Sequence, residues 1–272
     1  MKKLLVLFTA LFTSCLLFAF DSSVFLPKGD FNSYTKTQYN VTSKFGDFYR
    51  FADYKDVVNY DDNGLRVEVL TYDAKDQFVE KVVYTYNEDK TLKDYTLSDS
   101  TGKIESVTKC EYSDGKLKSE TEYDAKNAIL TKTIYKYEAN KNTEDFYNSN
   151  GELLTKKITF FKDNSEEVFE YNGDGELISR TVTAKLSDSK ISTVEKYNDL
   201  NELESKTVYK YDDKGNTTEV QIYNAANFLL QRNIYKNDDK GNATRISIYS
   251  ISEKFGTTVN ELKTIVEYAY KY

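Results

Sequence analysis

Apolar and polar residues alternate along most of this chain with a period of two. In residues 203–211, one side takes Leu203, Ser205, Thr207, Tyr209 and Tyr211, and the intervening positions are mostly charged. This period predicts a half-buried β-strand. Residues 212–216 then form a turn that contains Gly215, and residues 218–223 form the return strand. A connection this short makes the two strands antiparallel neighbours.

The same hairpin recurs at a spacing of 24–26 residues. One anchor position is occupied by Tyr72, Ser98, Tyr123, Tyr147, Tyr171, Tyr197, Tyr223 and Tyr249. An apolar residue lies six positions after every anchor: Phe78, Ile104, Ile129, Leu153, Leu177, Leu203, Leu229 and Phe255. These tandem repeats predict an all-β protein of about eight hairpin units, or about 16–18 strands, with a closing strand at residues 264–272.

The favoured shape is an elongated, twisted antiparallel meander, and a closed β-barrel is the alternative. A barrel of that many strands has an interior too wide for side chains to fill, which favours the meander. The last residues, Val266, Tyr268, Tyr270 and Tyr272, alternate like the terminal strand of outer-membrane barrels. However, lipid requires a continuously apolar face, and residues 203–211 have hydroxyls on one face and charges on the other. An outer-membrane β-barrel is therefore a further alternative.

The N-terminus predicts export. Lys2 and Lys3 precede the apolar run Leu4–Phe20, so residues 1–20 are interpreted as a signal peptide cleaved after Ala19. A second interpretation, based on the weak lipobox 12–15, has Cys15 lipidated. Residues 21–54 break the repeat and are interpreted as an N-terminal cap, followed by a β-hairpin repeat domain at residues 55–272. The predicted location is the periplasm, the outer surface or the medium, with membrane contact only through the leader or a lipid anchor.

Composition narrows the possible chemistry. The net charge is −7, and removal of Lys2 and Lys3 changes it to 35 − 44 = −9, which makes nucleic-acid binding unlikely. Because the chain has no histidine, it has no Ser-His-Asp triad, no Cys-His dyad and no histidine-ligated metal. No cofactor is expected. Cys110 occupies the position of Tyr84 or Tyr209 in other repeats, so it is predicted to be a packed side chain.

Several units resemble the tyrosine–aspartate (YD) repeats of bacterial surface and secreted proteins. The segments 209–216 (YKYDDKGN) and 59–65 (NYDDNGL) carry the resemblance, and residues 112–117 and 147–153 are weaker copies. The similarity covers about residues 55–255, but several units lack the glycine and have Asn for Asp. It implies an exported β-repeat scaffold, in some cases with a glycan or protein partner, and transfers no functional residue.

Two features could carry function. The adjacent carboxylates Asp61/Asp62, Asp212/Asp213 and Asp238/Asp239 could serve a hydrolase, but they recur at one turn position, which indicates turn chemistry. Six tyrosines could form a ladder that binds a glycan or a protein, unless they are simply a packing face: Tyr123, Tyr147, Tyr171, Tyr197, Tyr223 and Tyr249. The sequence therefore favours a non-enzymatic binding or structural protein of the bacterial envelope or surface, with a carboxylate hydrolase or an outer-membrane barrel as alternatives.

Overall fold

The computed structural model describes residues 27–29, 31–44, 47–185, 191–254 and 256–272, which form a single sheet of 18 strands. The strands are β1 (Ser33–Lys44), β2 (Asp47–Tyr60), β3 (Arg66–Tyr72), β4 (Phe78–Tyr86), β5 (Leu92–Asp99), β6 (Ile104–Ser113), β7 (Lys116–Asp124), β8 (Ile129–Tyr137), β9 (Lys141–Asn148), β10 (Leu153–Lys162), β11 (Ser165–Asn172), β12 (Leu177–Lys185), β13 (Ile191–Tyr197), β14 (Leu203–Tyr211), β15 (Thr217–Asn224), β16 (Leu229–Asn237), β17 (Ala243–Lys254) and β18 (Thr257–Lys271). No described helix is long and apolar enough to cross a membrane.

One type of turn builds most of the hairpins. In eleven of the described turns, the amide of an Asp or Asn donates to the carbonyl four residues later, and the amide three residues later donates back. In most of these turns the Asp or Asn side chain also accepts the amide four residues ahead, as Asp212 does from Asn216 at 2.8 Å. A left-handed residue completes the turn, such as Gly215 with φ 77°. These bonds explain why Asp61, Asp212 and Asp238 recur at one position.

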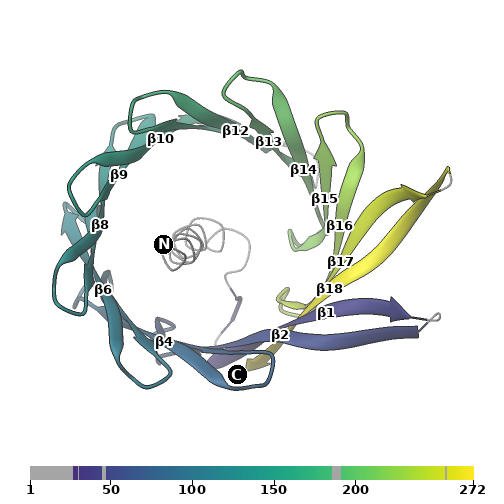
Figure 1. Ribbon diagram of the computed structural model, residues 1–272, viewed down its shortest axis with the longest axis horizontal. Helices are drawn as coiled ribbons and strands as arrows, with labels where there is room; N and C mark the ends of the chain where they lie inside the picture. The colour runs from purple at the N-terminus through teal and green to yellow at the C-terminus, as the bar shows by residue number, and fades with distance from the viewer. Residues whose placement is uncertain (1–26, 30, 45–46, 186–190, 255) are drawn as a thin grey trace, which may run out of the picture.

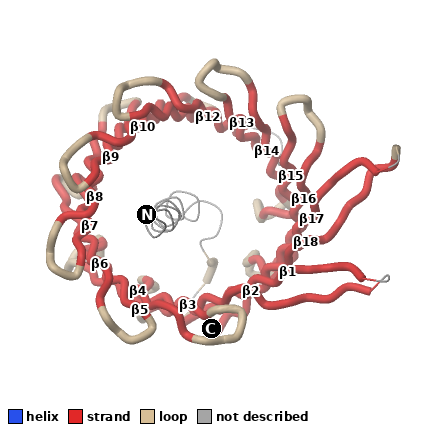
Figure 2. Tube along the Cα trace, viewed as in Figure 1, coloured by secondary structure: helices blue, strands red, loops and turns tan. Residues whose placement is uncertain are grey.

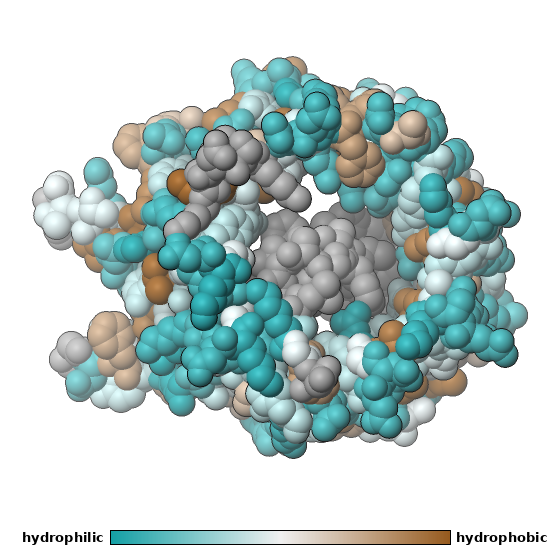
Figure 3. Space-filling view, turned by 180° about the vertical axis from the view of Figure 1, so that it is seen from behind, coloured by the Kyte–Doolittle hydropathy of each residue, from teal (hydrophilic) through white to brown (hydrophobic). Residues whose placement is uncertain are grey.

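The sheet closes on itself (Figures 1 and 2). Each strand pairs antiparallel with the next along the chain, and β1 also pairs with β18 from Ser33↔Lys271 to Asn40↔Thr264. The expected open meander is therefore wrong, and the alternative, a closed barrel, is confirmed. A closed ring does not require side chains to fill its interior. A barrel of this size can instead leave its lumen open, and openings through the ring are visible in Figure 3.

Residues 33–54 do not form a separate cap. They make up β1 and the first part of β2, so they belong to the wall. β1 pairs with β2 on one side and with the distant β18 on the other. The unpaired edge that a cap would protect is removed by this closure.

The barrel has two distinct ends. The terminal end contains residues 31–32, the C-terminus and the turns that follow even-numbered strands. The distal end contains the turns that follow odd-numbered strands, including the tips of the β1–β2 and β17–β18 hairpins. These two hairpins project from the ring and diverge from each other (Figure 1).

Aromatic side chains fasten the β1–β18 joint at the terminal end. Tyr34 lies 5.9 Å from Tyr270 between ring centroids, and Phe31 lies 4.9 Å from Tyr60 and 6.1 Å from Tyr270. The Tyr270 hydroxyl also donates to the Ala243 carbonyl at 2.9 Å. A small apolar core adjoins this cluster and consists of Ala243, Ile246 and Val266, with Tyr235, Ile248 and Tyr268 packed against them.

Candidate functional site

Cross-strand pairing sorts the wall into two faces. Directly paired residues lie on the same face of a sheet, and alternate residues along a strand lie on opposite faces. The first described residues lie inside the ring in Figures 1 and 2, and Phe31 among them packs on Tyr270. The face of Tyr34, Tyr268 and Tyr270 is therefore the lumen face. The C-terminal tyrosines Tyr268 and Tyr270 therefore point into the barrel.

The lumen face is acidic along one part of the wall. Following the pairing from β6 to β12 places five carboxylates on this face, here called the acidic lumen sector: Glu120, Glu122, Glu144, Glu166 and Glu170. All five are half-buried.

Neutral hydroxyls satisfy most of these carboxylates. Glu120 accepts from the Tyr135 hydroxyl at 2.6 Å, and Glu122 accepts from the Thr131 hydroxyl at 3.1 Å. Glu170 accepts from the Ser179 hydroxyl at 3.3 Å. Glu144 has a cationic partner, Lys157, at 3.4 Å. Because a hydroxyl donor leaves the carboxylate charge in place, the sector puts negative charge on the lumen face, where Lys157, which is also the cross-strand partner of Glu170, is a neighbouring cation.

Cys110 lies in the same lumen wall. It pairs with Glu120, its thiol lies 3.8 Å from that carboxylate, and the side chain is half-buried. Burial, followed by the negative charge of Glu120, raises the pKa of the Cys110 thiol to about 12. The thiolate is therefore scarce at neutral pH, which agrees with a packed side chain rather than a reactive one.

The six predicted ladder tyrosines do form one row, on the outer face near the distal end. Each pairs across its turn with an apolar residue, apart from Tyr249, which pairs with Leu262 of β18: Tyr123↔Ile129, Tyr147↔Leu153, Tyr171↔Leu177, Tyr197↔Leu203 and Tyr223↔Leu229. All six are half-buried. Because they occupy the outside of a closed ring, they do not pack against a second layer. Glycan or protein binding by this row stays a prediction.

On the strand that precedes each tyrosine's own strand, the cross-strand neighbour is often a cation. Lys132 pairs with Tyr147, Lys206 with Tyr223, and Arg232 with Tyr249. Arg180 lies 4.8 Å from the ring centroid of Tyr197, a cation–π distance. The row is thus a repeating set of tyrosine, apolar residue and cation around the outside of the barrel.

Ion pairs continue along the outer face below the tyrosine row. Arg232 contacts Glu219 at 2.6 Å, and Arg180 contacts Glu167 at 3.2 Å. Asp145, only 2% exposed, lies 2.8 Å from Lys136 and 3.5 Å from Lys156. This face is ionic over many strands and is not the continuous apolar band that hydrocarbon requires.

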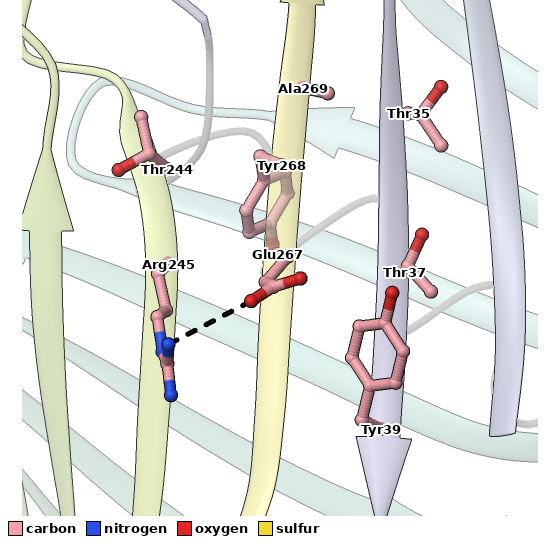
Figure 4. A pocket seen from close by; sticks show the side chains of 8 residues that line it. All are labelled: Thr35, Thr37, Tyr39, Thr244, Arg245, Glu267, Tyr268 and Ala269. Carbon is pink, nitrogen blue, oxygen red and sulfur yellow. Dashed lines mark ion pairs between the residues drawn. The ribbon is translucent and has the colours of Figure 1, made fainter. Parts of the chain in front are cut away.

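A shallow groove of about 320 Å³ crosses the wall where β1 meets β18 (Figure 4). Glu267 lies at its centre, 3.8 Å from Arg245. Arg50, from the projecting β1–β2 hairpin, reaches back to Glu267 at 2.9 Å and covers the Tyr39 ring at 4.5 Å. The groove therefore marks where the hairpin is held against the wall.

The remaining predicted sites lie elsewhere. The signal peptide, residues 1–20, and the lipidation candidate Cys15 are outside the described residues. The acidic lumen sector was not predicted from the sequence. The period-two pattern does place these glutamates on one face of the sheet, together with Cys110 and Tyr135. The pattern alone does not show whether that face points into the barrel or outward.

Known proteins resemble this chain in fold and not in sequence. No family model matches the chain, and no curated protein matches it in sequence. Among solved structures, a porin-like protein from Bacteroides uniformis aligns with 90% of this chain and 99% of its own, at 11% identity and a TM-score of 0.50. A porin from Rh. blastica aligns at 9% identity over 88% and 99% of the two chains, with a TM-score of 0.36.

The first of these likenesses shows a porin-like fold. Together with the closed ring, it supports a barrel fold in place of the expected open meander. The identity is too low to transfer a function, and the tyrosine–aspartate resemblance stays a prediction.

Proposed function

We propose that the protein is an exported, non-enzymatic, porin-like barrel whose lumen is a hydrated compartment for small cationic solutes. The observation that carries this proposal is the acidic lumen sector, because its carboxylates face one enclosed space and are satisfied mainly by neutral hydroxyls. Barrels of 16–18 strands leave an aqueous interior. Carboxylates that line such a space concentrate cations and exclude anions.

The charged residues of the outer face support a barrel that is surrounded by water, at the cell envelope, rather than by lipid. A lysine or arginine facing lipid near the bilayer midplane costs about 2–4 kcal/mol. The outer face has such residues on successive even-numbered strands, including Lys132, Lys156, Arg180, Lys206 and Arg232. Their carboxylate partners would be desolvated with them.

A pore that spans the outer membrane is the second candidate. It is supported by the number of strands, the closed ring and the porin-like fold. In that setting the tyrosine row would occupy one membrane interface, where aromatic girdles of such barrels lie. The ion pairs of the outer face would need a protein or headgroup environment to replace water.

The lumen proposal is tested by titrating the purified mature chain with spermidine, a small trication, in a calorimeter. The triple variant Glu120→Gln, Glu122→Gln, Glu144→Gln should bind it about tenfold more weakly, because three charge interactions of about 0.5 kcal/mol each are lost. The control Glu152→Gln, Glu176→Gln, Glu202→Gln removes the same charge from distal turns and should leave binding unchanged. Equal loss in both variants would show only a net-charge effect and contradict the proposal.

Bilayer recordings separate the two placements. A chain that is soluble without detergent and gives no conductance supports the barrel in water. A stable conductance that selects potassium over chloride, and loses this selectivity in the lumen triple variant, supports the outer-membrane pore.

A further inference from the structure

Exposed large apolar side chains gather at the distal end of the barrel. Among the residues that the structure describes, fourteen such side chains are exposed, and ten of them lie in or beside the distal turns or near the tip of the β1–β2 hairpin. The other four lie at the terminal end: Tyr137, Phe160, Phe161 and Tyr272. Two ends built from the same kind of hairpin therefore differ in surface chemistry.

The most exposed of the distal side chains in the ring lie on two adjacent turns. Leu200 in the β13–β14 turn is 72% exposed, and Phe228 in the β15–β16 turn is 63% exposed. Because β14 pairs with β15, these turns lie about 10 Å apart. Leu230, 46% exposed, follows on β16. Leu200, Phe228 and Leu230 are here called the distal apolar patch.

Turn formation does not account for these side chains. The Leu200 amide donates to the Asn198 side chain, and the Phe228 amide donates to the Asn224 side chain, so both turns use the backbone of the apolar residue. In the other distal turns of this type, the equivalent two positions hold polar residues or alanine, such as Asp174. An exposed apolar side chain that the fold does not need indicates contact with a partner.

The outer wall behind the patch changes from aromatic to ionic over a short distance. The tyrosine row comes first, where Tyr197 pairs with Leu203 and Tyr223 pairs with Leu229. Two residues from Tyr197 along β13, about 7 Å, Glu195 begins the ion pairs of the wall with Lys206 at 3.9 Å. The apolar edge is therefore shallow.

This order of layers matches the surface of a lipid bilayer. Apolar side chains of an interfacial protein reach the boundary of the acyl chains, aromatic residues lie among the headgroups, and charged residues stay in water. The patch protrudes on separate turn tips, and a fluid surface accepts such tips without a shaped groove. The net charge of −7 and the neighbouring carboxylates Asp199 and Glu202 disfavour anionic headgroups, which leaves zwitterionic lipid.

We propose that the distal apolar patch docks the barrel on a surface of zwitterionic phospholipid while the wall stays in water. Leu200, Phe228 and Leu230 enter the boundary between headgroups and acyl chains, and Tyr197 and Tyr223 lie at the headgroups. Insertion stops there because the lysines and arginines of the wall are costly in hydrocarbon. The distal mouth of the lumen then faces the membrane, whatever the lumen itself binds.

Flotation with phosphatidylcholine vesicles that contain a fluorescent dye tests this docking on the purified mature chain. Wild type should float with the vesicles and release no dye. Leu200→Ser, Phe228→Ser should partition about a hundredfold more weakly, because each buried apolar side chain contributes about tenfold. The control Tyr137→Ser, Phe161→Ser removes two exposed apolar side chains from the terminal end and should float like wild type.

Tryptophan fluorescence provides a second readout, because the chain contains no tryptophan. The emission of Phe228→Trp should shift to shorter wavelength when vesicles are added, and that of Phe161→Trp should not. This pair tests docking even where the serine variant fails to fold.

Flotation that only the distal variant loses, together with the Phe228→Trp shift, supports the proposal. Wild type that stays with the buffer overturns it, as does an equal loss in the distal variant and its control. An equal shift of both tryptophans also overturns it, because contact would then not be confined to one end. Dye release overturns it in favour of a barrel inserted across the bilayer.

Discussion

At the residue scale, a carboxylate or amide at the first turn position does the same structural work throughout the chain. Asp61 and Asp212 accept the amides of Leu65 and Asn216, and Asn148 and Asn198 accept the equivalent amides in their own turns. The two residue types differ in that Asp titrates, whereas the Asn side chain also donates, as Asn148 and Asn198 do to Glu152 and Glu202. The amide hydrogen bonds lower the pKa of Asp61 and of Asp212 below the ordinary value of an aspartate.

Acid stability should therefore depend on the aspartates in these turns. A carboxyl group whose pKa is lower in the folded state stabilises the fold above its unfolded pKa, about 3.9, and this contribution is lost as the pH falls through the folded pKa. The variant Asp61→Asn, Asp212→Asn keeps the oxygen that accepts the Leu65 and Asn216 amides without titrating, and at position 212 it loses the second oxygen, which accepts from the Asn216 side chain. We expect its acid unfolding midpoint, followed by circular dichroism, to lie at lower pH than that of wild type.

The control is Asp62→Asn, Asp213→Asn. These residues follow in the same two turns, and the Leu65 and Asn216 amides are bonded to their neighbours instead. An equal shift in both variants would attribute the effect to net charge and contradict the role of the turn hydrogen bonds.

At the element scale, the hairpins could be predicted from the sequence because each one is formed by neighbouring residues. Closure of the barrel could not, because it joins strands that are distant in the chain. Residues 203–211 are β14 as expected, and the apolar residue six positions after an anchor is its direct partner across the turn, as in Tyr223↔Leu229. The β1–β18 joint has no such signal, because its strands are more than two hundred residues apart and share no turn. The same lack of a local signal explains why the cap predicted at residues 21–54 includes residues 33–54, which belong to the wall.

The aromatic cluster at the terminal end should determine the strength of this joint. Tyr270→Ala removes contacts with Tyr34, Phe31 and Tyr268 and the hydrogen bond to Ala243. We expect a loss of about 2–4 kcal/mol in the free energy of unfolding, in the range of large core truncations. Tyr270→Phe should lose only about 1 kcal/mol, the contribution of one hydrogen bond.

Denaturant unfolding measures both variants, and Tyr249→Ala in the outer row provides the comparison. Amide exchange locates the effect, because the weakened joint should exchange faster in β1 and β18 than in β8. Uniform acceleration around the ring would contradict a localised closure.

At the scale of the whole molecule, a ring of repeats can hold a lumen without a conventional core. Among the residues that the structure describes, few side chains are buried, and several of them are polar, such as Thr108, Ser119 and Asp145. The sequence did reveal the repeat and the mixed character of both faces. It could not reveal which face encloses space, because neither face is uniformly apolar. The acidic lumen sector therefore became recognisable only once the ring was closed.

A closed ring of equivalent hairpins should tolerate the loss of one complete unit. Deleting residues 198–223 removes β14 and β15 with one turn from each end and joins Tyr197 to Asn224, which begins an equivalent turn. All strand directions are preserved, so sixteen strands can still close. Barrel diameter grows roughly in proportion to strand number, so the ring should narrow by about one ninth. Small-angle scattering measures this narrowing, and circular dichroism should retain the strand signal.

Deleting residues 198–210 instead removes one turn and β14 up to its last residue, Tyr211, and reverses the direction of every later strand. β18 would then meet β1 in parallel, and the antiparallel Ser33↔Lys271 to Asn40↔Thr264 ladder could not form. We expect this variant to aggregate or to remain open, although it lacks fewer residues than the longer deletion. If both deletions close equally well, the β1–β18 ladder is not what completes the barrel. If only the longer deletion closes, the barrel requires an even number of strands, so that β18 meets β1 antiparallel, and the number of deleted residues does not decide the outcome.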